Sequence, residues 1–257
     1  MSRMALSTTP PPACLRLLSA NIQAGASTQG YAHYLTRSLH QLLPVPGKRS
    51  NLDALAETVR EFDLVGLQES DPGSLRSGFL NQTHYLAEAA GFPFWSHQPN
   101  RRVGKLATSA NAMLSRIEPD EVRDYPLPGR IGGRGVLWAR FGWDEAALIV
   151  MVAHLSLGAK SRLAQIAFIA ELVQDAPNTV LMGDFNCEPG TSEMQTLFRR
   201  CDICPPDEYL PTFPSWSPRR AIDHILTSRR VRVERRWALP SQASDHLATA
   251  AEIILPA

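Results

Sequence analysis

One stretch of the chain, from Val180 to Gly190, reads VLMGDFNCEPG. It begins with apolar residues that suit a buried strand, and it turns away at a proline and a glycine. Asp184 and Asn186 lie between these two parts, and residues two apart on a strand point to the same face. Because an unpartnered buried carboxylate is costly, an acid ending such a strand favours a functional site, with a structural cap as the alternative. We therefore expect other polar side chains to converge on this strand end.

The composition is typical of a globular protein. The 257 residues suffice for one large α/β domain or two small ones, and 44% of them are hydrophobic and 20% charged. The formal net charge is only +1, whereas tight binders of nucleic acid are usually more basic, so a nucleic-acid partner is possible but not favoured. No run approaches the roughly 20 apolar residues of a transmembrane segment, and no signal-peptide pattern is present. We expect a cytoplasmic monomer.

The chain is expected to form one domain. We predict a flexible N-terminal tail at 1–13 and a single domain at 14–257. The Pro-rich segment 201–219 is the only candidate linker, but polar site candidates both precede and follow it. Cys201 and Cys204 have CxxC spacing, but no second pair or nearby histidine completes a zinc site, so we interpret them as structural.

The spacing of apolar residues predicts a chain of strands and helices. We expect strands at 14–21, 63–69, 109–116, 136–141, 147–154, 178–184, 221–226 and 231–239, and a last strand after His246. We expect helices at 31–43, 50–62, 78–90, 160–174 and 191–200, and a short extended piece beginning at 92–95. The basic segment 101–105 and the polar segment 118–128 are predicted to be loops. Ser50 is the predicted N-cap of its helix.

The first of these helices has two interpretations. A helical apolar stripe at 31–43 usually packs on the core, but this one follows the first strand directly and could lie over the substrate. The whole segment 26–49 is long enough to shape a cleft.

Several expected strands end in polar side chains. They are Asn21, Glu69, His154, Asp184 with Asn186, Asp223, and Asp245 with His246. Carboxylate and amide oxygens are the ligands that Mg²⁺ or Mn²⁺ prefers, and Glu69 is the natural first ligand, with Asn21 and Asp245 adding oxygens. The sequence contains neither an HExxH motif nor closely spaced Cys and His residues, which would indicate a zinc site. His154 and His246 suit proton transfer near neutral pH.

This set of residues fits the hydrolysis of a phosphate ester. A cation polarises the phosphoryl oxygen, and a carboxylate or histidine activates water. The chain contains neither a GxSxG motif nor a P-loop. Arg134 follows two glycines and suits contact with phosphate, whereas Asn111 either binds phosphate or ties strands together. His224 is expected to be structural, since it points away from the side of Asp223 on its strand.

The order of the motifs resembles that of the endonuclease/exonuclease/phosphatase superfamily. The motifs are Ser19-Ala20-Asn21, Leu67-Gln68-Glu69-Ser70, Asn111-Ala112-Met113-Leu114-Ser115, His154-Leu155, Gly183-Asp184-Phe185-Asn186, Ile222-Asp223-His224-Ile225 and Ser244-Asp245-His246. The resemblance covers about residues 14–253. It implies an α/β (α+β) fold, a four-layer α/β sandwich of two packed, mainly antiparallel sheets flanked by helices.

The same resemblance implies roles for the candidate residues. It places Mg²⁺ (or Mn²⁺) at Asn21 and Glu69, with Asp245 as a further ligand. It implies the following catalytic set: Asp184 to orient or activate water, Asn186 to bind phosphate or a second metal, His154 and His246 to stabilise phosphate and transfer protons, and Asp223 to orient a histidine. Arg134 resembles an arginine that contacts substrate phosphate.

Three functions remain open at this point. The first is a Mg²⁺-dependent phosphoester hydrolase, in which water attacks a phosphodiester or phosphomonoester of a small-molecule or lipid substrate. The second is a nuclease on DNA or RNA, although Ala153-His154-Leu155 replaces the Tyr-containing segment that apurinic-site enzymes typically carry. The third is a catalytically inactive binding module, against which the intact set of metal and histidine positions argues.

Overall fold

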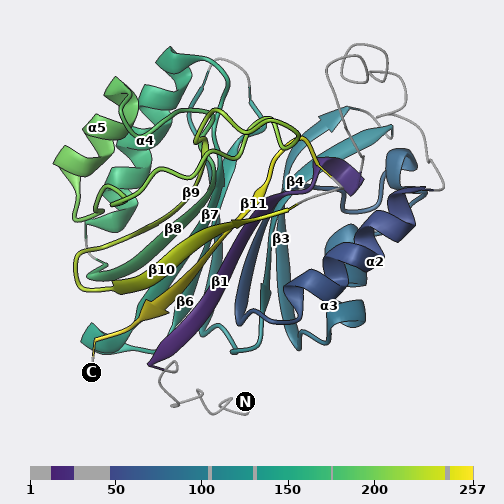
Figure 1. The fold of residues 1–257 in the computed structure, drawn as a ribbon, viewed down its shortest axis with the longest axis horizontal. Helices are drawn as coiled ribbons and strands as arrows, with labels where there is room; N and C mark the ends of the chain where they lie inside the picture. Colours follow the sequence, from purple (N-terminus) through teal and green to yellow (C-terminus); the bar gives the residue numbers. More distant parts are fainter. Residues whose placement is uncertain are drawn as a thin grey trace, which may run out of the picture.

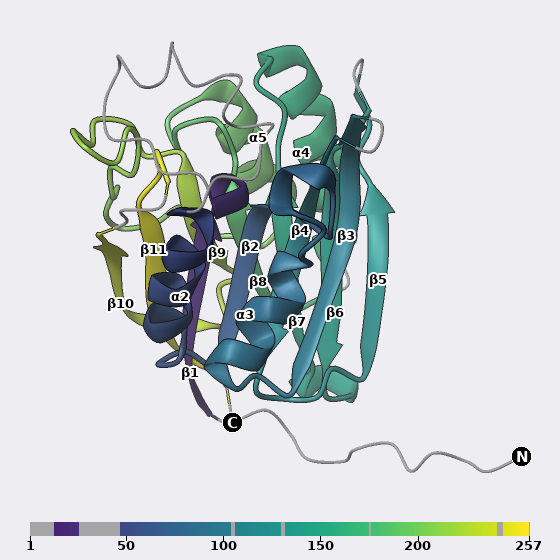
Figure 2. The ribbon, with the colours of Figure 1, turned by 90° about the vertical axis from the view of Figure 1, so that its right-hand side faces the viewer.

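Two β-sheets pack face to face, and helices cover their outer faces (Figures 1 and 2). The computed structural model describes residues 13–25, 47–103, 106–129, 132–174, 176–240 and 244–256. The layers run helix, sheet, sheet, helix, which confirms the predicted four-layer sandwich. The predicted helix at 31–43 and nearly all of the predicted tail lie outside the described residues.

The first sheet has six strands in the order β10-β11-β1-β2-β4-β3. Its strands are β1 (Cys14–Asn21), β2 (Leu64–Ser70), β3 (Phe94–Val103), β4 (Ala107–Ser115), β10 (Arg232–Leu239) and β11 (Ala248–Ile254). Helices α2 (Gly47–Val59) and α3 (Gln82–Ala90) pack on its outer face (Figure 1). Short 3-10 turns follow β1 at Gln23–Gly25 (η1) and β2 at Leu75–Ser77 (η3).

The second sheet has five strands in the order β5-β6-β7-β8-β9. They are β5 (Glu121–Pro126), β6 (Gly135–Phe141), β7 (Leu148–His154), β8 (Asn178–Asp184) and β9 (Asp223–Thr227). Helices α4 (Ala159–Val173) and α5 (Ser192–Arg200) cover its outer face (Figure 2). A 3-10 turn, η4 (Asp144–Ala146), joins β6 to β7. Among the helices described, none has both the length and the apolar character needed to cross a bilayer.

The directions of the strands define one functional edge of the sandwich. Strands β1 and β2 are parallel to each other, as are β7 and β8, while the other neighbours are antiparallel. The ends of β1 and β8 meet, because the side chains of Asn21 and Asp184 are hydrogen-bonded. Strands β1, β2, β7 and β8 therefore all end at the same edge, at the top of Figure 1, and we call it the site edge.

Strand β8 shows why its sequence is almost entirely apolar. Val180 and Met182 lie in the core between the two sheets, while Leu181 lies in the core beneath α4 and α5. Both faces of the strand are thus buried, and each fully buried side chain of this kind contributes about 1.5–3 kcal/mol. At Gly183 (φ 144°), a Cβ would lie 1.9 Å from the carbonyl oxygen of Ala153, so only glycine fits directly before Asp184.

Two predicted loops are wrong. Strand β3 runs through Val103 and includes most of the segment 101–105, and β5 occupies the segment 118–128. Both are edge strands, and β5 is largely exposed, so neither shows the apolar alternation by which buried strands are recognised.

Two predicted helix starts are also wrong. Helix α2 begins at Gly47, so Ser50 lies inside it and is not its N-cap. Helix α3 begins at Gln82 rather than 78, because Asn81 accepts a hydrogen bond from the backbone N–H of His84 and caps it. Gly91 ends this helix in the left-handed conformation, as predicted for a glycine stop.

Candidate active site

Polar side chains from both sheets meet at the site edge around Asp184. The Nδ2 of Asn21 donates to Asp184 Oδ2 at 3.1 Å, and His154 Nε2 lies 3.4 Å from the same oxygen. His246 Nε2 lies 3.9 Å from it, and His246 Nδ1 bonds Asp223 Oδ2 at 2.8 Å. Five residues predicted from five separate segments of the chain are thus brought into one buried cluster.

Asp184 is held in one orientation by its neighbours. Its Oδ1 accepts the backbone N–H of Asn186 at 2.9 Å, while its Oδ2 accepts the amide of Asn21. Burial, and after it the nearby carboxylate of Asp223, raise the pKa of Asp184, while the imidazole of His246 lowers it by less. The resulting pKa is about 7. A carboxyl group with such a pKa can take up and release a proton near neutral pH.

Asn186 does not share a strand face with Asp184. Strand β8 ends at Asp184, and Asn186 adopts the left-handed conformation (φ 52°) two residues later. Its Nδ2 donates to the carbonyl oxygen of Leu155 at 3.0 Å. The alternation expected of a strand fails because the chain has already turned, and the amide instead holds the segment that follows His154.

The Asp223–His246 pair is saturated with hydrogen bonds. Both carboxylate oxygens of Asp223 lie within 3.0 Å of His246 Nδ1, and Asp223 Oδ2 also accepts the hydroxyl of Thr212 at 2.5 Å. Burial would lower the pKa of His246, but the charge and hydrogen bond of Asp223 raise it to about 10. The imidazole is therefore a cation at neutral pH, with its Nε2–H facing Asp184 and Asp245.

The Pro-rich loop that precedes β9 holds this pair in place. The ring of Phe213 packs on the ring of His246 with centroids 5.0 Å apart. The backbone N–H of Leu247 donates to the carbonyl oxygen of Thr212, and that of Ser215 donates to the carbonyl oxygen of Asp245. Thr212 is a site residue that the sequence does not predict, because a single threonine in an irregular segment belongs to no periodic pattern.

Glu69 and Asp245 form a second arrangement, which we call the acid pair. Glu69 lies within β2 and not at its end, at an irregularity in the β2–β4 pairing where its φ is 58°. Burial raises the pKa of Asp245, the positive charge of His246 lowers it in part, and the negative charge of Glu69 raises it again. Asp245 Oδ1 lies 3.8 Å from His246 Nε2, whereas the side chain of Glu69 has no hydrogen bond or ion pair with the residues that the structure describes. A left-handed non-glycine residue costs about 1–3 kcal/mol, and such strain clusters at functional sites.

The acid pair fits a hard cation better than the tightest cluster of ligand atoms does. Atoms of Asp184, Asp223 and His246 lie within 4.8 Å of one another, close enough to surround a metal. However, these carboxylates are already hydrogen-bonded, and a protonated imidazole has no lone pair for a metal. In the acid pair, Asp245 has only the distant Nε2 of His246 as a positive neighbour and Glu69 has none among the described residues, so a divalent cation would offset their negative charge.

Three further residues singled out in the sequence have surroundings that differ from those of the buried cluster. Asn111 is fully buried and donates from Nδ2 to the carbonyl oxygens of Gly135 at 2.7 Å and Val152 at 3.3 Å, so it ties β4 to the other sheet. Burial holds the pKa of His154 well below its usual value, and the positive charge of Arg134 lowers it further. His224 contacts the carbonyl oxygen of Cys187, in keeping with a structural role.

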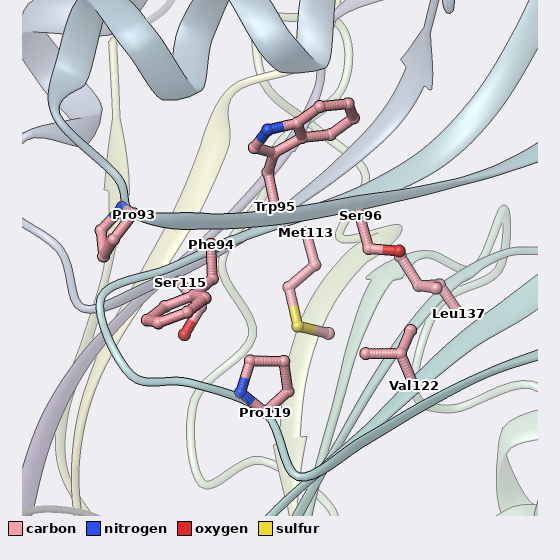
Figure 3. Close-up of a pocket in the computed structure, with 9 residues that line it drawn as sticks. All are labelled: Pro93, Phe94, Trp95, Ser96, Met113, Ser115, Pro119, Val122 and Leu137. Carbon is pink, nitrogen blue, oxygen red and sulfur yellow. The ribbon is translucent and has the colours of Figure 1, made fainter. Parts of the chain in front are cut away.

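An apolar cavity of about 280 Å³ lies away from these residues (Figure 3). Phe94, Met113, Val122 and Leu137 line it, between the two sheets and toward the edge opposite the site edge. None of the residues that line it is titratable. The cavity therefore lacks the groups that phosphate chemistry requires, and the site edge remains the candidate active site.

Comparison with known proteins identifies the family of this chain. The model of the endonuclease/exonuclease/phosphatase family matches residues 18–246. The uncharacterized protein YbhP of Escherichia coli (strain K12) is 29% identical over 86% of this chain and 95% of its own. An endonuclease/exonuclease/phosphatase from Beutenbergia cavernae has a TM-score of 0.74 at 18% identity, covering 95% of this chain and 72% of its own. A mannosyl-6-phosphatase from Bacteroides thetaiotaomicron has a TM-score of 0.68 at 19% identity. The match covers 94% of this chain and 100% of the phosphatase chain. At these identities the two solved structures show the fold alone.

Proposed function

Because this chain belongs to the endonuclease/exonuclease/phosphatase family, we propose that it hydrolyses phosphate esters with the help of Mg²⁺ or Mn²⁺. One observation carries the proposal. An acid pair lies beside a buried aspartate and a cationic histidine at one edge of the sandwich, and one of its members, Glu69, has no ion-pair partner among the described residues. Hydrolysis of a phosphate ester needs these elements together, namely a cation site, a base and a group that stabilises negative charge.

The acid pair would hold the cation. Glu69 and Asp245 supply carboxylate oxygens, and Asn21 Oδ1 adds an amide oxygen, although it also accepts the backbone N–H of Gln23 at 3.1 Å. A bound Mg²⁺ polarises a phosphoryl oxygen and offsets the charge of the phosphate.

Asp184 is the proposed base. It accepts a proton from the attacking water, and its pKa of about 7 suits that transfer at neutral pH. The amide of Asn21 and the backbone N–H of Asn186 orient its two oxygens, so the carboxylate does not rotate away from the water. Asn186 also holds the segment after His154 through Leu155.

The two histidines are proposed to face the phosphate. His246 donates from Nε2 to a phosphoryl oxygen and stabilises the negative charge that develops there, while Asp223 and Thr212 fix its ring through Nδ1. His154 is neutral because its pKa is lowered, and its Nε2 lies beside Asp184. Arg134 is proposed to contact the phosphate from the side of His154.

We propose a small-molecule or lipid phosphate ester as the substrate. The net charge of +1 supports this choice over a nucleic acid, and the mannosyl-6-phosphatase of similar fold supports a phosphomonoester. A nuclease is the second candidate, because Arg219 and Arg220 are exposed on the loop that packs on His246 and could contact a nucleic-acid backbone.

Hydrolysis assays with added metals test the proposal. The purified full chain is assayed with Mg²⁺, with Mn²⁺ and with EDTA on p-nitrophenyl phosphate, bis-p-nitrophenyl phosphate, a phospholipid and plasmid DNA. We expect metal-dependent hydrolysis of an ester that is lost in Glu69→Gln and in His246→Ala. Equal, EDTA-resistant turnover by the wild type and both variants would show that the proposal is wrong, and nicking of plasmid at physiological salt would favour the nuclease.

A further inference from the structure

Exposed apolar side chains gather at the site edge. Of the nine large hydrophobic residues that are exposed in the described part of the chain, four lie in loops at this edge: Leu75, Phe79, Leu106 and Leu157. Phe79 is 69% exposed and Leu157 is 78% exposed. The first two follow the end of β2, Leu106 precedes β4, and Leu157 follows the end of β7. Because β2 and β7 end at the site edge and β4 begins there, all four flank the candidate active site.

The exposed aromatic residues at the opposite edge are packed differently. Trp95 stacks on the ring of His97 and contacts the tilted ring of His84. Trp143 lies beneath the guanidinium of Arg140 and donates from Nε1 to Asp120. Phe79, in contrast, has no ring or cation partner among the described residues. Its exposure therefore serves no packing within this part of the chain.

The loop that carries Phe79 is fixed by a buried carboxylate. Asp71 accepts hydrogen bonds from the backbone N–H groups of Gly73 and Ser74 and from Arg76 Nε, at 2.7–2.9 Å. The backbone N–H of Arg76 donates to the carbonyl oxygen of Leu106 at 3.0 Å, which joins this loop to the start of β4. Phe79 itself adopts φ 65°, a conformation that a bulky residue rarely takes. The loop that carries Phe79 is therefore tied to the backbone of Leu106.

The loop that carries Leu157 is fixed in the same way from the other sheet. Arg162 donates to the carbonyl oxygen of Ser156 at 3.3 Å and to that of Leu157, and it forms a buried ion pair with Glu193 at 2.8 Å. Hydrogen bonds thus fix the backbones of two loops, one from each sheet, that carry exposed apolar side chains at the site edge. A loop backbone that is already ordered loses little conformational entropy when the loop binds a surface.

We propose that the site edge docks on the surface of a phospholipid bilayer, so that the ester bond cleaved belongs to a membrane lipid. The inference rests on the proposed function and names its substrate class. Three of the four exposed side chains are aliphatic and offer poor stacking surfaces for bases, whereas single-stranded nucleic acid is usually bound on aromatic platforms. Aliphatic side chains instead enter the boundary between headgroups and acyl chains. The exposed Lys160, Arg219 and Arg220, near the same edge, would contact lipid phosphates.

Vesicle binding tests the inference separately from catalysis. The full chain is sedimented with vesicles of phosphatidylcholine containing phosphatidylserine, and hydrolysis is measured both on the vesicles and on bis-p-nitrophenyl phosphate. In the double variant Phe79→Ser/Leu157→Ser we expect the affinity for vesicles to fall about 100-fold. Each side chain of this size that is buried in the bilayer increases the affinity roughly tenfold. The ratio of hydrolysis on vesicles to hydrolysis of the soluble ester should fall with it. The matched control is Val122→Ser, which alters an exposed apolar side chain at the opposite edge and should change neither measurement.

Glu69→Gln separates this inference from the proposed function. We expect this variant to bind vesicles as the wild type does and to hydrolyse neither substrate. A wild type that hydrolyses the soluble ester but does not bind vesicles would overturn the docking inference and leave the proposed function standing. Undiminished vesicle binding by Phe79→Ser/Leu157→Ser would overturn it as well, and so would release from vesicles by single-stranded DNA. Vesicle binding without hydrolysis of any ester would instead contradict the proposed function.

Discussion

The Asp223–His246 pair and the acid pair lie side by side but differ in how their charges are compensated. His246 Nε2 is 3.8 Å from Asp245 Oδ1, so the two arrangements almost touch. In the first, Asp223 has both a cationic partner and the hydroxyl of Thr212. In the second, Glu69 and Asp245 repel each other, and Glu69 has no partner among the described residues. Among the described residues, Asp223 thus has a close counter-charge and Asp245 shares the same histidine, whereas Glu69 has no counter-charge and would receive one only from a bound cation.

This difference has consequences for both stability and activity. A buried charge with a hydrogen-bonded partner stabilises the fold as long as both partners are present, and removal of one leaves the other uncompensated. A pair of like charges destabilises the fold until a cation binds. Substitutions on the two sides should therefore affect stability in opposite directions while both reduce activity.

The largest effect on stability is expected for His246→Ala. Asp223 and Asp184 would then be buried without the cation that pairs with them among the described residues, and the free energy of unfolding should fall by about 3–5 kcal/mol at neutral pH. Urea denaturation followed by circular dichroism measures the change. His84→Ala is the control, because His84 is a half-exposed histidine whose loss should change the stability little. A loss as small as that of the control would mean that the pair does not support the fold.

Glu69→Gln should reduce activity strongly while sparing stability. Loss of a group that stabilises charge in the transition state typically lowers kcat by about 10²–10³-fold. Without metal, the variant should be at least as stable as the wild type, because its neutral amide no longer repels Asp245. Steady-state kinetics and urea denaturation in EDTA measure the two quantities. A variant that is clearly less stable than the wild type in EDTA would show that Glu69 already has a stabilising partner.

A smaller effect is expected for Thr212→Val, which removes the second hydrogen bond to Asp223. The free energy of unfolding should fall by about 1 kcal/mol, and kcat should fall about tenfold because the ring of His246 is less firmly oriented. Thr212→Ser keeps the hydroxyl and should restore most of kcat. Equal kcat values for the valine and serine variants would contradict a positioning role for this hydroxyl.

The smallest effect on stability is expected at Glu193. Like Asp223, this acid has a partner of opposite charge, which here is Arg162. Burial would raise the pKa of Glu193, but hydrogen bonds from its own N–H, Arg162 and Ser192 hold it below the ordinary 4.5. Its stabilising contribution is therefore present above pH 4.5 and is lost as the pH falls through the lower value in the folded protein. Urea denaturation across this acid range should show a shallower loss of stability for Glu193→Gln than for the wild type. If the wild type and Glu193→Gln lost stability equally as the pH fell, the lowered pKa of Glu193 would be contradicted.

The residues that the sequence could predict are those that a buried strand carries to its end. Asp184 was predictable because an apolar run with both faces buried stops at an acid after an obligatory glycine. The pattern did not predict the direction of Asn186, since the turn after β8 replaces the strand geometry. Thr212 was not predictable, because its contact with Asp223 depends on how a loop folds back in three dimensions.

The fold was predictable to a similar degree. The central strands and the helices α4 and α5 have both apolar periodicity and clear ends, and the structure confirms them. The edge strands β3 and β5 were missed in whole or in part, because a strand with an exposed side needs no apolar alternation. The start of α2 was misplaced by a serine that resembled an N-cap.

Thermal stability with and without Mg²⁺ tests the difference between the two sides most directly. A ligand that binds only the folded protein stabilises it by about 2.7 kcal/mol at a hundred times its Kd. We predict that Mg²⁺ raises the Tm of the wild type and of His246→Ala, which keeps both acids, but not that of Glu69→Gln or Asp245→Asn. The assignment of the cation to the acid pair would be contradicted if Mg²⁺ raised the Tm of Glu69→Gln as much as that of the wild type. It would also be contradicted if Mg²⁺ failed to raise the Tm only in His246→Ala.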